Sequence, residues 1–105
     1  MPQKQSQPER EHTIAQTDRR VEHPPMFRVV MHNDDYTSQN FVVVILQEIF
    51  HRAPADAARI MLEVHTRGFG VAGTYPYEIA ETKVHRVHEL AMANGFPLKC
   101  SIEAH

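Results

Sequence analysis

Three polar side chains of different chemistry stand where an ammonium group could be bound. Asn33 and Asp35 lie in the segment 33–37, between two apolar runs, and His65 lies much farther along the chain. An amide oxygen, a carboxylate and an imidazole nitrogen all accept hydrogen bonds. Charge-assisted hydrogen bonds contribute roughly 1.5 to 3 kcal/mol each. Three such acceptors beside an apolar pocket would suit an ammonium group on a hydrophobic side chain, although the sequence only permits this grouping.

The same residues also have a purely structural interpretation. The segment 33–37 is typical of a turn that ends a strand and starts a helix. Met61 precedes Val64 by three residues and His65 by four, so these three residues share a helix face. A histidine at the edge of such an apolar face is most often satisfied by a backbone carbonyl. From spacing alone we favour that interpretation for His65.

A second cluster could bind a metal ion. Glu81, His85 and His88 occupy positions i, i+4 and i+7 of an expected helix, so one face could present three ligands. The spacing is not that of the HExxH motif, and no glutamate is placed as a catalytic base. We favour a solvated helix face without metal. A metal-dependent hydrolase using His85, His88 or His65 is the enzymatic alternative, and a plain protein-interaction domain is a third.

Composition limits the class of protein. The 105 residues suggest one domain, which can form a core without disulfides or metal. The net charge of -2 gives no basic footprint for nucleic acid. A single cysteine, Cys100, suits a reducing compartment, and its alternating context predicts a small core residue. No apolar run approaches the ~20 residues of a membrane span, and the first 20 residues contain no apolar region of the kind that a secretory signal needs. We expect a cytoplasmic protein without cofactors, membrane contacts or nucleic-acid partners.

The chain divides into two parts by composition. Residues 1–23 contain almost no large apolar side chains, and such a segment cannot bury enough surface to offset the entropy of ordering. We predict a disordered N-terminal extension over 1–23. Pro24 and Pro25 mark the boundary, and residues 24–105 form the folded domain.

The first half of the domain predicts a strand and a helix. Residues 26–32 alternate in a way that indicates a strand with one face in the core. The run 41–46 is ambiguous, because a β-branched run can be a buried strand. We favour a helix over 38–51, capped by Thr37 or Ser38, because apolar residues recur at helical spacing.

The second half predicts two more helices and two strands. A helix over 54–67 starts with proline and stops before glycine. Residues 68–73 favour a short strand flanked by tight backbone. A helix follows over 76–95, and alternation over 98–103 predicts a last strand. The order β-α-α-β-α-β predicts an α+β fold with a small sheet and helices on one face.

Several motifs of the chain match one family in the same order. They are the run Val29 to Thr37, the pair Phe41-Val42, the run Met61 to His65, Gly68, the run Glu78 to Lys83, and the run Pro97 to Cys100. In combination these motifs are specific, and the similarity extends from about Val21 to Glu103. The chain resembles the ClpS adaptors of the bacterial N-end rule pathway.

This resemblance implies an adaptor and not an enzyme. Its fold would have three antiparallel strands and three helices, similar to the C-terminal domain of the ribosomal stalk protein. It would recognise N-degron substrates that begin with Leu, Phe, Tyr or Trp. It would deliver them to the ClpA unfoldase of the ClpAP protease by docking, as a monomer, on the N-terminal domain of ClpA.

The resemblance also assigns roles by motif position. The substrate α-amino group would be held by Asn33, Asp35 and His65, and the rim would be shaped by Asp34 and Thr37. The side-chain pocket would be lined or supported by Val42, Ile45, Leu46, Met61, Val64 and Leu98. Docking on the unfoldase would use Glu78 and Lys83. The extension over 1–23 would match the family's mobile N-terminal segment.

One position departs from the family pattern. Many members have methionine just beyond the Asn-Asp-Asp-Tyr-Thr run, as a gate of the pocket against β-branched side chains, and this chain has Gln39. Glutamine is of similar length but polar. We expect the binding of the amino group to be intact, and the order of affinities for substrates that begin with Leu, Phe, Tyr or Trp to differ.

Overall fold

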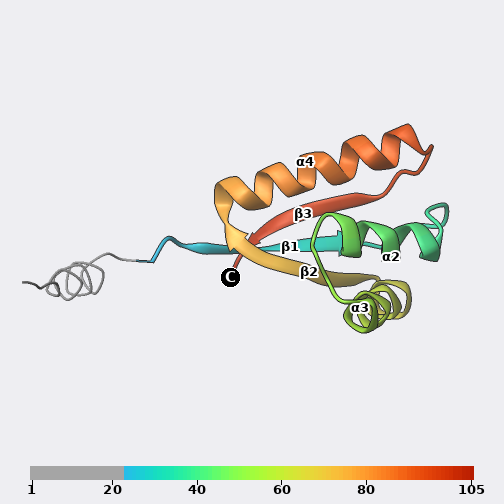
Figure 1. Ribbon diagram of the computed structural model, residues 1–105, viewed down its shortest axis with the longest axis horizontal. Coiled ribbons are helices and arrows are strands. Elements are labelled where there is room, and N and C mark those ends of the chain that lie inside the picture. Colours follow the sequence, from blue (N-terminus) through green and yellow to red (C-terminus); the bar gives the residue numbers. More distant parts are fainter. Residues whose placement is uncertain (1–22) are drawn as a thin grey trace, which may run out of the picture.

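The structure is a computed structural model that describes residues 23–105. The predicted extension, residues 1–23, lies outside this range except for His23. The elements follow the order β1 (Met26–His32), α2 (Gln39–Glu48), α3 (Pro54–Arg67), β2 (Phe69–Pro76), α4 (Tyr77–Ala93) and β3 (Lys99–Ala104) (Figure 1). The predicted β-α-α-β-α-β order and α+β class are confirmed.

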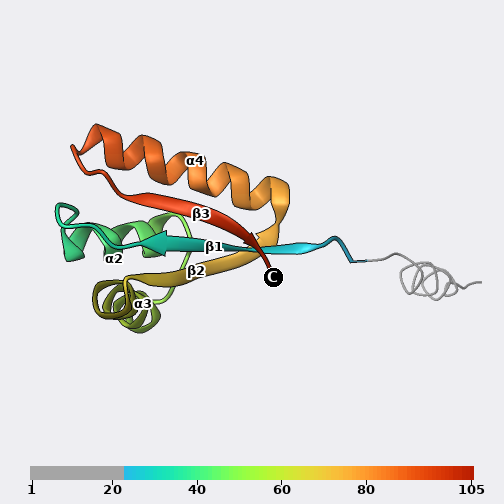
Figure 2. The same ribbon diagram turned by 180° about the vertical axis from the view of Figure 1, so that it is seen from behind.

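The three strands form one antiparallel sheet in the order β2-β1-β3. Helix α2 lies in front of the strands in Figure 1 and behind them in Figure 2. His32, the last residue of β1, pairs with Phe69 at the start of β2 and with Lys99 at the start of β3. The loop after β1 therefore leaves the sheet at the edge where both of its neighbours begin.

The core lies between the sheet and the helices. Val29 and Met31 of β1 are fully buried, as are Ile45 and Leu46 of α2. The predicted core face of β1 is found, and Val30 on the opposite face is also buried, at 4 % exposed, although it is not part of the core cluster. Cys100 is buried, and burial raises the pKa of its thiol to about 12. Its predicted role as a small core residue is confirmed.

Two element boundaries differ from the predicted ones by three residues, and the others differ by two at most. Helix α2 ends at Glu48 instead of residue 51: Ile49 is its C-cap, a turn follows, and His51 has a left-handed φ of 56° that cannot continue the helix. Strand β2 continues to Pro76 instead of ending at residue 73, because Gly73 to Pro76 stay paired with β1. Helix α4 therefore begins at Tyr77, and Pro76 is its N-cap.

The other predicted helix ends lie within two residues of the observed ones. Of the two predicted caps for α2, Ser38 is the one used, because its Oγ accepts a hydrogen bond from the Phe41 N–H at 3.1 Å. Pro54 is the first residue of α3, and Gly68 ends that helix with a φ of 94°, a conformation that glycine adopts without steric cost. Within residues 23–105, no helix combines the length and the apolar character that crossing a membrane requires.

Candidate functional site

The loop between β1 and α2 is built on the side chain of Asp34. Its Oδ1 accepts hydrogen bonds from the backbone N–H groups of Tyr36 at 2.8 Å and Thr37 at 2.7 Å, and its Oδ2 accepts one from the Thr37 hydroxyl at 2.8 Å. Partial burial raises the pKa of Asp34, but these three hydrogen bonds outweigh it and leave the pKa below its usual value. Asp34 therefore stabilises the turn in its ionised form.

The end of α3 is tied directly to this loop. The Asn33 N–H donates to the Gly68 carbonyl at 2.9 Å, and the Gly68 N–H donates to the Val64 carbonyl at 3.0 Å. A Cβ on Gly70 would come within 2.9 Å of Val64 Cγ2, so the glycine lets α3 lie close against β2. These contacts bring the last turn of α3, which carries His65, beside Asn33.

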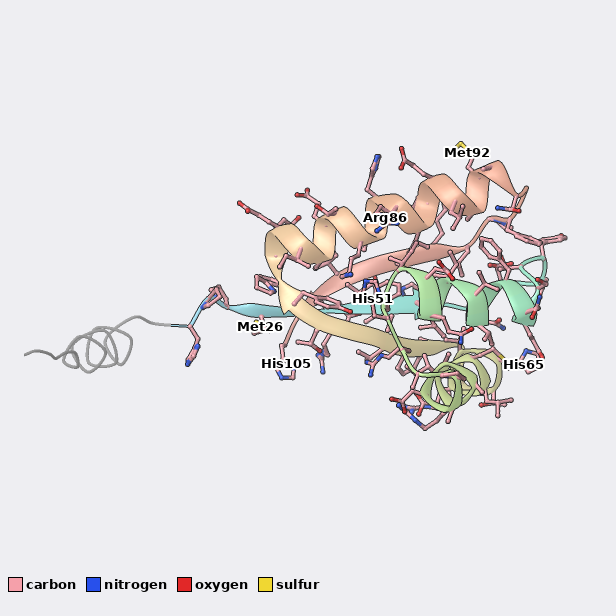
Figure 3. All side chains as sticks on the ribbon, viewed as in Figure 1. Met26, His51, His65, Arg86, Met92 and His105 are labelled. Carbon is pink, nitrogen blue, oxygen red and sulfur yellow. The ribbon has the colours of Figure 1, made fainter. Side chains whose placement is uncertain are left out.

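A hollow of about 390 Å³ lies between this loop, the start of α2 and the last turns of α3. Figure 3 shows His65 at the end of the molecule where α2 begins. The hollow is lined by Asn33, Asp34, Asp35, Tyr36, Thr37, Ser38, Gln39, Val42, Met61, Val64 and His65. The structure thus brings together nine of the twelve side chains predicted for peptide binding. The other three, Ile45, Leu46 and Leu98, lie in the core and do not line the hollow.

The polar side chains of the hollow differ in what they bind. Within residues 23–105, the side chains of Asn33, Asp35 and His65 take part in no hydrogen bond, and all three are exposed. The oxygens of Asp34, in contrast, are occupied by its own turn. Among the residues that the structure describes, 23–105, no lysine or arginine lines the hollow. A negatively charged rim with free acceptors, next to an apolar wall, suits an ammonium group rather than an anion.

Two lining residues were missing from the sequence prediction. Tyr36 is 78 % exposed at the rim, and Ser38 lines the hollow while it caps α2. Both lie between residues that were predicted to line the site. Their position inside the same loop could have indicated that they line the hollow.

A larger hollow, of about 530 Å³, involves the other face of the sheet. Its lining comprises Arg28, Val30, His32, Arg67, Gly68, Phe69, Val71 and Glu103. The imidazole of His32 is already hydrogen-bonded to Ser101 Oγ at 2.7 Å, and the Arg67 guanidinium lies 5.0 Å from the centroid of the Phe69 ring. Two guanidinium groups make this hollow unsuited to an ammonium ligand, in spite of its size.

The two residues predicted for docking have different environments. Glu78 is exposed in the first turn of α4, between the exposed side chains of Tyr77 and Ile79. Lys83 is partly buried, and its ammonium group donates to the Ile49 carbonyl at 2.7 Å. The carboxylate of Glu78 is therefore exposed to solvent, whereas the ammonium group of Lys83 is hydrogen-bonded within the molecule.

The alternative metal ligands do not converge. His85 Nε2 lies 3.3 Å from a carboxylate oxygen of Glu89, whereas His88 Nε2 accepts a hydrogen bond from the Cys100 N–H at 3.1 Å. No group of three histidine, cysteine, aspartate or glutamate side chains within residues 23–105 is placed to hold a metal ion. Glu81 is exposed on α4. The geometry gives no support to a metal-dependent hydrolase.

Comparison with known proteins gives one family. Residues 22–101 match the model of the family described as ATP-dependent Clp protease adaptor protein ClpS. An ATP-dependent Clp protease adapter protein ClpS of Desulfatibacillum aliphaticivorans is 53 % identical over 90 residues, 86 % of each chain. The corresponding protein of Desulfotalea psychrophila is 61 % identical over 80 residues, 76 % of this chain and 78 % of that one.

A solved structure agrees with these sequence matches. The structure of Agrobacterium tumefaciens ClpS2 bound to L-phenylalaninamide superposes with a TM-score of 0.75 at 34 % identity, covering 79 % of this chain and all of that one. The family model covers most of the sequence, and the relatives match along most of their own length. The chain therefore belongs to the ClpS family of Clp protease adaptors, and it is an adaptor and not itself an enzyme.

Proposed function

We propose that this adaptor binds N-degron substrates by their free α-amino group and by a bulky N-terminal side chain, Leu, Phe, Tyr or Trp. The observation that carries the proposal is the pairing of free acceptors with an apolar wall in one hollow. Asn33, Asp35 and His65 hold the ammonium group, and Val42 and Met61 contact the side chain. Asp34 and Thr37 shape the rim through their mutual hydrogen bond.

The free energies of the individual interactions indicate what affinity this arrangement can reach. A charge-assisted hydrogen bond contributes about 1.5 to 3 kcal/mol, and burial of a Leu or Phe side chain adds about 1.5 to 3 kcal/mol. Association costs at least several kcal/mol in lost freedom. Three hydrogen bonds and one buried side chain together contribute about 6 to 12 kcal/mol, so the roughly -8 kcal/mol of micromolar affinity requires contributions at the upper end of this range. Loss of one acceptor is therefore expected to be measurable.

The ligand of the structural relative has the required chemistry. L-Phenylalaninamide, the molecule bound to Agrobacterium tumefaciens ClpS2, carries a free α-amino group and an aromatic side chain. A peptide that begins with phenylalanine presents the same two groups. The relative therefore supports the assignment of the hollow to an N-terminal residue and its amine.

The second half of the proposed function is delivery to a ClpA-type unfoldase in the cytoplasm. Adaptors of the Clp protease act on a Clp ATPase, and we assign docking on its N-terminal domain to the exposed first turn of α4. Tyr77, Glu78 and Ile79 present one carboxylate between two apolar side chains there. Substitution of Glu78 by lysine is expected to weaken binding to the ATPase without changing peptide affinity.

The test of substrate binding is a titration with matched peptides. Peptides that begin with Leu, Phe, Tyr or Trp are compared with the same peptides after N-terminal acetylation, which removes the ammonium charge. Binding is expected for the free peptides and lost on acetylation. Equal binding of both forms would instead indicate a general protein-interaction surface. Asp56→Ala, which removes a carboxylate at the other end of α3, is the control variant and is expected to bind normally.

A further inference from the structure

One face of the sheet is not covered by a helix within the described part of the chain. The core cluster contains Val29 and Met31 of β1, whereas Val30 lies on the opposite face. In Figure 2, which views this opposite face, the strands lie in front of α2 and no helix of residues 23–105 crosses them. The hollow of about 530 Å³ described above lies on this side, and we call the surface around it the open face.

The centre of the open face is apolar. Val30 pairs in register with Val71 of β2. Phe69 lies two residues before Val71 on the same strand, and therefore on the same face. Val71 is only partly buried, Phe69 is 43 % exposed, and all three side chains line the hollow. Exposed apolar side chains that gather around a hollow are typical of an interaction site.

Cations surround this apolar centre. The Arg67 guanidinium lies 5.0 Å from the centroid of the Phe69 ring, and Arg28 lines the same hollow. Lys99 is exposed and pairs in register with the last residue of β1, whose side chain also lines the hollow. The acidic side chain among them is that of Glu103. Because the whole chain carries a net charge of -2, the local excess of positive charge belongs to the open face and not to the composition.

The Arg28 guanidinium is incompletely paired. Its Nη2 donates to the Ala104 carbonyl at 3.2 Å, whereas its Nε is buried and has no hydrogen-bond partner within residues 23–105. A guanidinium carries five N–H donors, and a buried donor without an acceptor costs free energy. Carboxylates bind this group through two parallel hydrogen bonds. A carboxylate on the open face would therefore supply acceptors that the fold leaves missing.

We propose that the open face is a docking surface for an acidic polypeptide segment that carries an aliphatic or aromatic side chain. The apolar side chain of the partner lies in the hollow against Val71 and Phe69, and its flanking carboxylates bind the guanidinium groups. An apolar centre and the carboxylate of Glu103 favour such a segment over a nucleic acid, whose phosphates need an uninterrupted basic surface. Among the described residues, this hollow and the peptide hollow share no lining residue. Both can therefore be occupied at the same time.

The test uses a synthetic peptide in which one phenylalanine is flanked on both sides by glutamates. The peptide is acetylated, so that it has no ammonium group for the peptide hollow, and its matched control has glutamine in place of glutamate. We expect the acidic peptide to bind at least tenfold more tightly than the glutamine peptide, and more weakly as salt is raised.

Two variants locate this binding on the open face. Arg67→Gln should weaken binding of the acidic peptide about threefold, as expected for an exposed ion pair, and Phe69→Ser about threefold to tenfold. Arg59→Gln removes an exposed arginine from the same helix, away from this hollow, and should change nothing. All three variants should bind a Phe-initiated peptide normally, which shows that they are folded and that the two sites are independent.

The unsubstituted protein gives a second measurement that does not depend on any variant. On titration with the acidic peptide, the amide NMR signals of Val30, Phe69 and Val71 should shift, and those of the loop 33–39 should not. The proposal is overturned if the glutamine peptide binds equally well, if an oligonucleotide binds more tightly than the acidic peptide, or if the shifts lie on another surface. It is also overturned if these signals shift with protein concentration alone, because a second copy of the chain would then cover the open face.

Discussion

Replacing Asp35 by alanine is expected to weaken binding of a Phe-initiated peptide by about tenfold to a hundredfold, without changing the stability of the fold. The side chain of Asp35 makes no hydrogen bond within residues 23–105, so its removal leaves no partner unsatisfied there. One charge-assisted hydrogen bond contributes about 1.5 to 3 kcal/mol, and about 1.4 kcal/mol corresponds to a tenfold change in affinity. Because Asp35 is exposed, water can partly replace it, which favours the lower end of this range.

The neighbouring residue is expected to behave in the opposite way. Asp34→Ala removes the acceptor of three hydrogen bonds and leaves the N–H groups of Tyr36 and Thr37 without their partner. Loss of a comparable capping side chain costs about 0.5 to 2 kcal/mol. We expect the free energy of unfolding to fall by about 1 kcal/mol. Peptide binding should weaken only as far as the loop loses its shape.

The assay pairs peptide titration with urea unfolding for the wild type and both variants at one salt concentration. Asp35→Asn is added as an intermediate, since it keeps an acceptor oxygen and removes the charge. Binding of the peptide by Asp35→Ala like the wild type would contradict the assigned role of Asp35. An Asp34→Ala variant that is as stable as the wild type and loses binding would show that the two aspartates have exchanged roles.

Three further predictions concern other parts of the molecule. Gln39→Met is expected to change the order of affinities among Leu-, Phe-, Tyr- and Trp-initiated peptides, and an identical order in both proteins would contradict a selective role for the glutamine. Burial lowers the pKa of His88 from its usual 6.5, so on acidification the imidazole is protonated at a higher pH in the unfolded chain than in the folded one. The contribution of His88 to the free energy of unfolding should be complete above pH 6.5 and should be lost as the pH falls through the lower pKa of the folded state. The variant His88→Gln can still accept a hydrogen bond from the Cys100 N–H. Its thermal unfolding temperature should therefore decrease less between pH 7.5 and 5.5 than that of the wild type. In Gly73→Ala, the new Cβ would collide with the Tyr75 ring, and urea unfolding should show a loss of about 1 to 3 kcal/mol.

Local chemistry made much of the fold predictable. Pro54 and Gly68 bound α3 as predicted, because a proline in the first turn and a left-handed glycine at the end are local preferences. The ends of α2 and β2 were not predictable in this way. They depend on the left-handed backbone of His51 and on the continued pairing of Gly73 to Pro76 with β1, and pairing between distant segments leaves little trace in local sequence.

The sequence by itself determined the residue types of the candidate site and the elements that carry them. Motifs in fixed order pointed to Asn33, Asp35 and His65, and local spacing placed the histidine near the end of a helix. Only the tertiary structure decided how the two neighbouring aspartates are bonded: Asp34 accepts three hydrogen bonds from its own turn, whereas the side chain of Asp35 makes none within residues 23–105. It also decided that the Lys83 ammonium is hydrogen-bonded within the fold, because the Ile49 carbonyl that accepts this bond is 34 residues away. Contacts of that kind depend on how helices pack, which local sequence does not encode.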